Sequence, residues 1–402
     1  MRILFLGGAG AMGSVAAREL AKSDEVSEVT IADIDMRRAE RLVIDIGSKK
    51  ISACSMDAND HRALVQSMRG KNVVINCVGP FYQFGTKILG AAIEAKVNYV
   101  DICDDPETTL AMLDLDKFAR DAGVSCLIGM GANPGLSGIL AKHGASKLDR
   151  VDEINVYWTL SMTDWMEGGA AVDYHMYMVV DGKQPEYLNG KIVNVPPFSK
   201  TKEVDFGGEV GKCEVFYVGH PEQFTLPRSI KGVKVVTNMC AITPSWAYKH
   251  LRNVVELGLT STKPVKVKGI SLPCRDFLVQ WDLQVYFPMV EKTMDLGSRD
   301  SGMIIEIIGE KDGQPKEIRY GEPGRMAQGT GIPVAIGAQM LGRGDIKAKG
   351  VVLPPDCIDP KPFLGEYEKR YTEALEELLT REENSEETEP TFTTHSLDKN
   401  HR

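Results

Sequence analysis

The stretch that decides the fold joins an apolar strand to a glycine loop. Ile3-Leu4-Phe5-Leu6 indicates a buried strand, and Gly8-Ala9-Gly10-Ala11-Met12-Gly13 after it fits the pattern G-x-G-x-x-G. The glycine pattern alone is weak, but here it follows a predicted strand and opens a predicted helix over residues 11–22. The sequence therefore predicts a dinucleotide-binding βαβ unit.

Each position of the loop has an expected task. Gly8 allows the tight turn, Gly10 lets a pyrophosphate approach the backbone, and Gly13 lets helix and strand pack closely. Ala11 and Met12 lie in the first helical turn, whose free N–H groups and partial positive charge favour phosphates. A glycine turn in an α/β domain that binds nothing is the alternative.

An acidic residue lies at the expected distance from this loop. Asp33 follows Gly13 by 20 residues, at the end of the second predicted strand. A carboxylate there accepts hydrogen bonds from the adenosine ribose and repels a 2′-phosphate, so we expect NAD rather than NADP. Arg37 and Arg38 lie just beyond and soften that preference. Asp57, after the third predicted strand, either binds the adenine amino group or caps the next helix.

Apolar runs and amphipathic stretches alternate through the first third of the chain. The predicted strands cover residues 3–6, 29–32, 51–55, 73–77, 99–101 and 124–128. They are continuous runs rich in Val, Ile and Leu, which is typical of parallel strands buried on both faces. Residues 1–135 are therefore predicted to form an α/β domain, a Rossmann-type doubly wound parallel sheet.

The pattern changes after Pro134. Short apolar runs, several with period-2 alternation, predict strands over residues 153–158, 215–218, 233–236 and 278–287, with helices near 171–180 and 247–259. Residues 136–325 are expected to form a second, α+β domain with an antiparallel sheet. The polar residues 381–402 are predicted to be a disordered tail.

Composition narrows the functional classes. A net charge of -9 argues against nonspecific binding to nucleic acid or to an anionic membrane. No apolar run approaches the ~20 residues that span a bilayer. Eight cysteines without a C-x-x-C pair and the lack of a signal peptide indicate a cytoplasmic protein with reduced thiols. The seven histidines are scattered, so no metal site is expected.

Chemistry is expected beyond the carboxyl ends of the parallel strands. Three segments follow such ends, at residues 77–82, 101–105 and 129–135. From these segments we expect cofactor contacts by Cys77, Val78 and Gly79 and substrate contacts by Tyr82 and Asn133. Asp101 and Asp104 are candidates for the acid/base group, with helix capping as the alternative for Asp104.

The second domain should supply the remaining contacts. Tyr174 and His175 lie in a helix rich in tyrosine and methionine, and each is a candidate acid or base. A structural histidine among apolar residues is the alternative. His220 and Arg228 lie in residues 219–228, which are predicted to be irregular. Arg228 would grip a substrate carboxylate with two hydrogen bonds, or else make a surface ion pair.

Several further segments complete a recognisable pattern. They are Ala32-Asp33-Ile34-Asp35, Met56-Asp57-Ala58, Phe81-Tyr82-Gln83-Phe84, Tyr99-Val100-Asp101, Ala132-Asn133-Pro134-Gly135-Leu136, Leu341-Gly342-Arg343-Gly344 and residues 351–355. With the glycine loop, they make about residues 1–375 resemble the saccharopine dehydrogenase family, most closely its lysine 6-dehydrogenases. Ile34 and Ala58 thereby join the expected cofactor contacts. One departure is Cys103-Asp104-Asp105, where lysine-oxidising members often have Gly-Gly-His.

The resemblance implies an architecture and a reaction. C-terminal helices, about residues 326–380, would return to complete the Rossmann domain, and the second domain would bind substrate and form a homodimer or higher homo-oligomer. The activity would be that of an NAD(P)-dependent amino-acid dehydrogenase acting on a C–N bond, like lysine 6-dehydrogenase or saccharopine dehydrogenase. Two alternatives are a carboxy-polyamine or saccharopine-type reductase working in the condensing direction and a non-catalytic dinucleotide-sensing protein.

Overall fold

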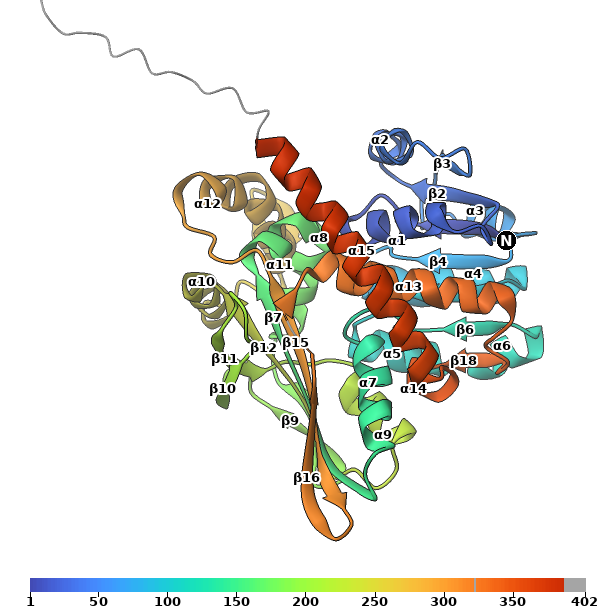
Figure 1. Cartoon of the computed structure of the whole chain (residues 1–402). Helices are drawn as coiled ribbons and strands as arrows, with labels where there is room; N and C mark the ends of the chain where they lie inside the picture. Colours follow the sequence, from blue (N-terminus) through green and yellow to red (C-terminus); the bar gives the residue numbers. More distant parts are fainter. Residues whose placement is uncertain (322, 387–402) are drawn as a thin grey trace, which may run out of the picture.

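The chain folds around two large sheets that stand side by side (Figure 1). The computed structural model describes residues 1–321 and 323–386. The first sheet has seven strands: β1 (Arg2–Leu6), β2 (Glu28–Asp33), β3 (Ile51–Ser55), β4 (Val73–Asn76), β5 (Asn98–Asp101), β6 (Ser125–Leu127) and β18 (Gly350–Val352). Its strand order is β18-β6-β5-β4-β1-β2-β3, and all neighbours are parallel.

Helices cover this parallel sheet. They are α1 (Ala11–Lys22), α2 (Met36–Ile46), α3 (His61–Met68), α4 (Phe81–Ala95), α5 (Pro106–Leu113), α6 (Asp116–Ala122) and α13 (Met326–Arg343). The strand order runs in opposite directions from β1, so the topological switch point lies between β1 and β4. Ligands of such sheets bind outside the carboxyl ends of the strands at that point. The predicted doubly wound sheet is confirmed.

The late helix α13 is part of this first layer. It packs along α1, and a Cβ added at Gly331 of α13 would lie 2.6 Å from the carbonyl oxygen of Met12. Only glycine allows the two backbones to come this close. The segment after residue 325 thus returns to the dinucleotide-binding layer, as the family resemblance implied.

The second sheet is mixed and mostly antiparallel, with the main order β10-β11-β12-β7-β15-β16. Its strands are β7 (Arg150–Ser161), β8 (Gln184–Leu188), β9 (Lys191–Val195), β10 (Thr201–Asp205), β11 (Lys212–Tyr217), β12 (Val235–Thr243), β15 (Ser301–Lys311), β16 (Gln314–Tyr320) and β17 (Pro323–Gly324), with a separate hairpin of β13 (Pro264–Val267) and β14 (Ile270–Pro273). The pair β7 and β12 is parallel. An α+β second domain is therefore confirmed, although its sheet is not purely antiparallel.

The remaining helices surround this second sheet or connect it to the first. They are α7 (Leu136–Ala145), α8 (Met162–Met178), α9 (Glu222–Ser229), α10 (Ser245–Glu256), α11 (Cys274–Trp281), the π-helix η1 (Asp282–Tyr286), α12 (Phe287–Thr293), α14 (Pro354–Cys357) and α15 (Pro360–Glu386). The long α15 runs diagonally between the two sheets and packs against α13 and α7 (Figure 1). None of the helices in the described residues is long and apolar enough to cross a membrane.

Two local predictions were wrong, and the predicted tail starts too early. Residues 278–287 are helical rather than extended: Asp282 is buried and Val285 is 51% exposed, the reverse of what the period-2 pattern requires. Residues 222–229 form α9, although the prolines in this segment suggested irregular chain; Pro221 stands at the helix start, where its missing N–H costs nothing. The predicted tail 381–402 begins inside α15, and residues 387–402 lie outside the described residues.

Replacing Gly331 with Ala tests the closure of the first layer by α13. The new methyl group would press on the Met12 carbonyl, so we expect a loss of about 1–3 kcal/mol in the free energy of unfolding and weaker dinucleotide binding. The matched control is Gly90→Ala in α4, where nothing lies within 4 Å of the added carbon. Urea unfolding of both variants measures the difference, and equal stability would contradict the tight α1–α13 contact.

Candidate active site

A cavity of about 680 Å³ lies between the two sheets, at the carboxyl ends of the parallel strands. Its wall combines the glycine loop and the segments after β4, β5 and β6 with parts of α7, α8, β7, β15, α13 and α15. Both layers of the fold therefore enclose one space. A volume of this size is within the range of small-molecule sites.

The glycine loop forms the phosphate end of this cavity. Gly10, Ala11, Met12 and Gly13 line it, and a Cβ on Gly10 would meet only the Gly7 carbonyl oxygen, at 3.4 Å. The first-turn N–H groups of α1 have no intrahelical acceptor and suit a pyrophosphate. These residues fit a bound dinucleotide.

Two glycines hold this loop in shape. A Cβ on Gly13 would lie 2.5 Å from the Gly7 carbonyl oxygen, so Gly13 permits the predicted close packing. The tight turn belongs to Gly7, with φ 70°, rather than to Gly8, which packs against Phe5 and does not line the cavity.

The residues expected at the adenosine lie outside the cavity wall, at the ends of β2 and β3. Asp33 accepts a hydrogen bond from the Asp35 N–H at 3.0 Å, and Ile34 beside it is 76% exposed. Asp57 accepts from the Asn59 N–H, and Ala58 follows it. Asp60 rather than Asp57 caps α3, which removes the capping alternative for Asp57. The adenosine contacts stay predictions.

The segment after β4 brings the first layer against the second. Cys77, Gly79 and Tyr82 line the cavity, whereas Val78 does not. A Cβ on Gly79 would lie 2.9 Å from that of Ala171 in α8. The cavity wall is thus continuous across the two layers at this point.

Asp101 is completely buried and does not line the cavity. Its carboxylate accepts hydrogen bonds from the N–H groups of Cys103 at 3.0 Å and Gly129 at 2.7 Å. Burial raises the pKa of Asp101 to about 6, although these backbone donors oppose the shift. The carboxylate ties the end of β5 to the loop after β6. This placement supports a structural role rather than proton transfer to a substrate.

His175 faces two carboxylates across the cavity. Its Nδ1 lies 3.4 Å from Asp104 and 3.6 Å from Asp105, and its side chain is 13% exposed. Burial lowers the pKa of His175, but the charges of Asp104, Asp105 and Glu222 outweigh it, so the pKa is raised above its usual value. Burial raises the pKa of Asp104, and His175 opposes that rise. The neighbouring carboxylates therefore favour the protonated form of His175.

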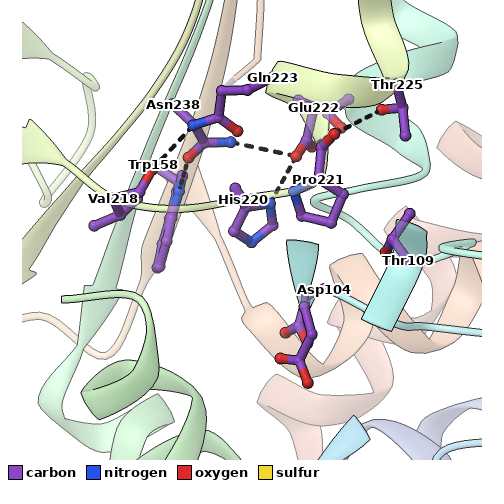
Figure 2. Close-up of polar contacts among 12 residues, drawn as sticks. Asp104, Thr109, Trp158, Val218, His220, Pro221, Glu222, Gln223, Thr225 and Asn238 are labelled. Carbon is purple, nitrogen blue, oxygen red and sulfur yellow. Dashed lines mark hydrogen bonds and ion pairs between the residues drawn. The ribbon is translucent and has the colours of Figure 1, made fainter. Parts of the chain in front are cut away.

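His220 belongs to a second histidine–carboxylate pair, shown in Figure 2. Its Nδ1 lies 2.6 Å from a carboxylate oxygen of Glu222, so the N–H there donates to Glu222 and leaves Nε2 as an acceptor. The ring of His220 lies 5.6 Å from that of His175, edge to face. The two histidines line the same cavity wall.

Glu222 itself is held from both layers. Its carboxylate accepts from the Ser137 hydroxyl at 2.7 Å and from the Asn238 amide at 3.4 Å. Asn133, with its amide group turned to suit this network, also donates to Glu222 and accepts from Trp158 Nε1 at 3.1 Å. Asn133 therefore lies at the site, where its first contact is with Glu222.

Two predicted site residues lie elsewhere. Arg228 is exposed on α9 and does not line the cavity, because α9 turns it outward. Tyr174 also lies outside the wall; its hydroxyl donates to Asp276 at 3.1 Å, and its ring packs edge-on against Tyr82. Neither placement supports the substrate or acid/base role expected from the sequence.

Sequence reasoning missed Glu222 and Arg325. Glu222 follows His220 by two residues, and a carboxylate so close to a candidate histidine was the available signal. Arg325 lines the cavity, is 7% exposed and pairs with Asp300 at 3.2 Å. It is the one arginine or lysine in the wall as far as residues 1–321 and 323–386 describe it.

The fold also gathers potential metal ligands that are scattered in the sequence. Asp104, His175 and His220 each offer an atom within 4.8 Å of the others. His175 already faces both Asp104 and Asp105, which favours a proton-holding group over a metal site. The expectation that the protein needs no metal stays a prediction.

Both halves of the chain match known family models. Residues 3–127 match the saccharopine dehydrogenase NADP binding domain, and residues 182–372 match the saccharopine dehydrogenase C-terminal domain. The chain belongs to the saccharopine dehydrogenase family. This finding confirms the family that the sequence motifs indicated, and the chain is accordingly an NAD(P)-dependent oxidoreductase of the saccharopine dehydrogenase type.

Relatives in the saccharopine dehydrogenase family match over nearly the full length. Carboxyaminopropylagmatine dehydrogenase of Synechocystis is 24% identical, over 89% of this chain and 93% of the relative. Carboxynorspermidine synthase of Vibrio cholerae is 25% identical, over 89% and 92%. The solved structure of saccharopine dehydrogenase (L-Glu forming) from Saccharomyces cerevisiae has a TM-score of 0.67 at 16% identity, over 92% and 98%, which supports the fold.

Replacing Asp101 with Asn distinguishes a structural role from a catalytic one. Since the pKa of Asp101 is raised to about 6, its ionised form costs stability above that pH. We expect Asp101→Asn to raise the free energy of unfolding by about 1–3 kcal/mol near pH 8, with the gain vanishing near pH 4. Turnover should stay within about twofold, whereas loss of a proton-transfer group would cost about 10²-fold or more.

Replacing Asp104 with Asn tests the charge that acts on His175. Asp104 helps to keep His175 protonated above its usual pKa, so its neutralisation should lower the pKa of His175. We expect the basic limb of the pH profile of kcat/KM to move to lower pH. An unchanged limb in Asp104→Asn would show that His175 does not titrate in the reaction.

Proposed function

We propose that this protein forms the C–N bond of a carboxylated amine by reduction, joining a carbonyl-bearing amino acid to a second amine. One observation carries the proposal: two histidine–carboxylate groups lie at the same cavity as the glycine loop. In the first group His175 lies beside Asp104 and Asp105, and in the second His220 lies beside Glu222. Such a cavity has proton-transfer groups beside the place where a dinucleotide would bind.

The charges of the cavity suit an amine. Asp104, Asp105 and the buried Glu222 supply three carboxylates around two histidines. A cationic amine and the iminium ion derived from it are stabilised by such an arrangement, because negative groups already point to where positive charge develops. The same surroundings disfavour an anionic group at the reacting carbon.

The substrate carboxylate has a different proposed partner. Arg325 replaces Arg228 in this role, because its side chain lines the cavity and that of Arg228 does not. Its planar guanidinium presents five donors in a fork that matches the geometry of a carboxylate. The carboxylate and the reacting carbon would then contact different parts of the wall.

The histidines divide the proton transfers of the condensation. Nε2 of His220 takes a proton from the attacking ammonium, while Glu222 stabilises the imidazolium that results. His175 gives its proton to the departing hydroxyl, so water leaves and an iminium ion forms. When bound, NAD(P)H supplies the hydride that reduces this carbon. Asp104 and Asp105 then steady the positive charge until the secondary amine is made.

The names of two relatives support the proposed direction. The sequence alone favoured oxidation of a free amino acid such as lysine, with reductive condensation as the alternative. The names of the Synechocystis and Vibrio cholerae proteins refer to carboxylated polyamine-type products, which supports the alternative. The two histidine–carboxylate pairs favour catalysis over a dinucleotide sensor, since binding alone needs no proton-transfer groups.

Cofactor choice, assembly and location are further proposals. We favour NAD because Asp33, at the end of β2, is expected to face the adenosine ribose, where its charge would repel a 2′-phosphate, although the matching family model is named for NADP. Exposed apolar side chains on the hairpin and on α11 and α12, among them Ile270, Phe277 and Met289, support a homodimer through the second domain. A cytoplasmic location is also proposed.

The deciding assay follows dinucleotide oxidation by the purified protein with amino-acid aldehydes and amines offered in pairs. We expect turnover only when both partners are present, faster with NADH than with NADPH, and unchanged after chelator treatment. Arg325→Lys should raise KM for the aldehyde by about tenfold, because the planar grip is lost. NADH formation from lysine alone would instead favour the dehydrogenase activity, and binding without any turnover would favour a sensor.

A further inference from the structure

One face of the C-terminal helix forms part of the cavity wall. The residues of α15 that line it are Leu364, Tyr367, Glu368, Tyr371 and Thr372. Their spacing of three and four places them on one side of a helix. Figure 1 shows α15 running diagonally beside α8 and α13 towards α14, between the two sheets, and its cavity-lining face looks inward. Nothing in the reaction described above uses these side chains.

This face lies away from the reacting groups. Along α7, Leu136, Leu140 and His143 line the cavity in turn, and Ser137 at the start of that row binds Glu222. Seven residues of helix span about 10 Å. Leu140 belongs to the same apolar cluster as Leu364, so α15 closes the far stretch of the cavity.

Aromatic rings surround this far stretch. Tyr367 and Tyr371 lie 5.5 Å apart with their planes inclined by 35°, and the Tyr371 hydroxyl accepts the Arg325 N–H at 2.9 Å. The rings of Tyr320 and His143, which also line the cavity, lie 5.7 Å apart, and the Lys147 ammonium lies over the Tyr320 ring. Faces of tyrosine rings attract cations.

Glu368 adds a carboxylate to these rings. Within the described residues its side chain has no hydrogen bond or ion pair, unlike Glu366 and Glu373 on the same helix, which pair with Arg370 and Lys369. Glu368 is exposed at the edge of the cavity rather than buried. The Glu368 carboxylate lines the cavity without a partner, on the same helix face as the two tyrosines. Such an arrangement suits a cationic ligand.

We propose that Glu368, Tyr367 and Tyr371 bind a cationic nitrogen of the substrate that is remote from the reacting carbon. The inference rests on the proposed function and makes it more specific: the preferred substrates carry a second positive charge. That nitrogen belongs either to the far end of a diamine or to the α-ammonium of the amino acid.

Binding measurements on the full-length protein saturated with oxidised dinucleotide test this directly. Two matched ligand pairs are titrated by calorimetry: a short α,ω-diamine against the monoalkylamine of equal length, and norvaline against pentanoate. In one of the two pairs, we expect the ligand that carries the additional ammonium to bind about tenfold more tightly than its partner that lacks it. This factor is the one expected for a charge-assisted hydrogen bond. Glu368→Gln should abolish that preference and leave the affinity for the ligand that lacks the additional ammonium unchanged.

The control is Glu373→Gln, which removes the same charge from the same helix but from an exposed ion pair. It should keep the wild-type preference. Loss of preference in Glu368→Gln for the diamine pair, or for the norvaline pair, supports the proposal and identifies the source of the nitrogen. Equal preferences in wild type and Glu368→Gln, or equal weakening of all four ligands, would overturn it. Because no turnover is needed, failure of the reductase activity is measured separately.

Discussion

The buried carboxylate of Glu222 is the interaction on which the rest of the site depends. It is 1% exposed, and a charge removed from water so completely must be compensated by hydrogen bonds. Asn133 in the loop after β6, Ser137 of α7 and Asn238 of β12 supply three of them, and His220 supplies a fourth, at 2.6 Å. The contacts that solvate the carboxylate therefore also hold the second domain against the first and fix the ring of His220 over the carboxyl ends of the parallel strands.

The negative and positive side chains of the cavity lie in different parts of its wall. The proton-holding group of His175 with Asp104 and Asp105 lies beyond β5, whereas the cation Arg325 lies beside β17 at the start of α13. A dinucleotide on the glycine loop would reach the space between the two layers, where both histidines stand. Enclosure by both layers lowers the local dielectric and strengthens each of these interactions. The proposed reductive C–N condensation requires proton transfer and charge stabilisation, and this arrangement of groups supports both.

The sequence predicts this architecture in its strongly patterned parts. Continuous apolar runs and the glycine loop predict the parallel sheet. The place of Asp104 directly after a predicted strand indicates a site residue. Both signals depend only on residues that are close together in the chain. Side-chain direction is not local: Asp101 follows the same rule yet points into the core, and Arg228 points to solvent because it lies on an unforeseen helix. Glu222 escaped notice because its role depends on Ser137, 85 residues away in the chain. Residues 278–287 alternate in polarity, yet Asp282 is buried within a helical layer.

The central claim is that this site reduces a carbon bound to nitrogen. The most direct test supplies the protein with dinucleotide carrying deuterium on the transferable position of nicotinamide C4, together with an amino-acid aldehyde and an amine. Mass spectrometry of the product then locates the label. The account predicts one deuterium on the carbon that joins the new secondary amine. Deuterium in an alcohol derived from the aldehyde, with no C–N product, would contradict it.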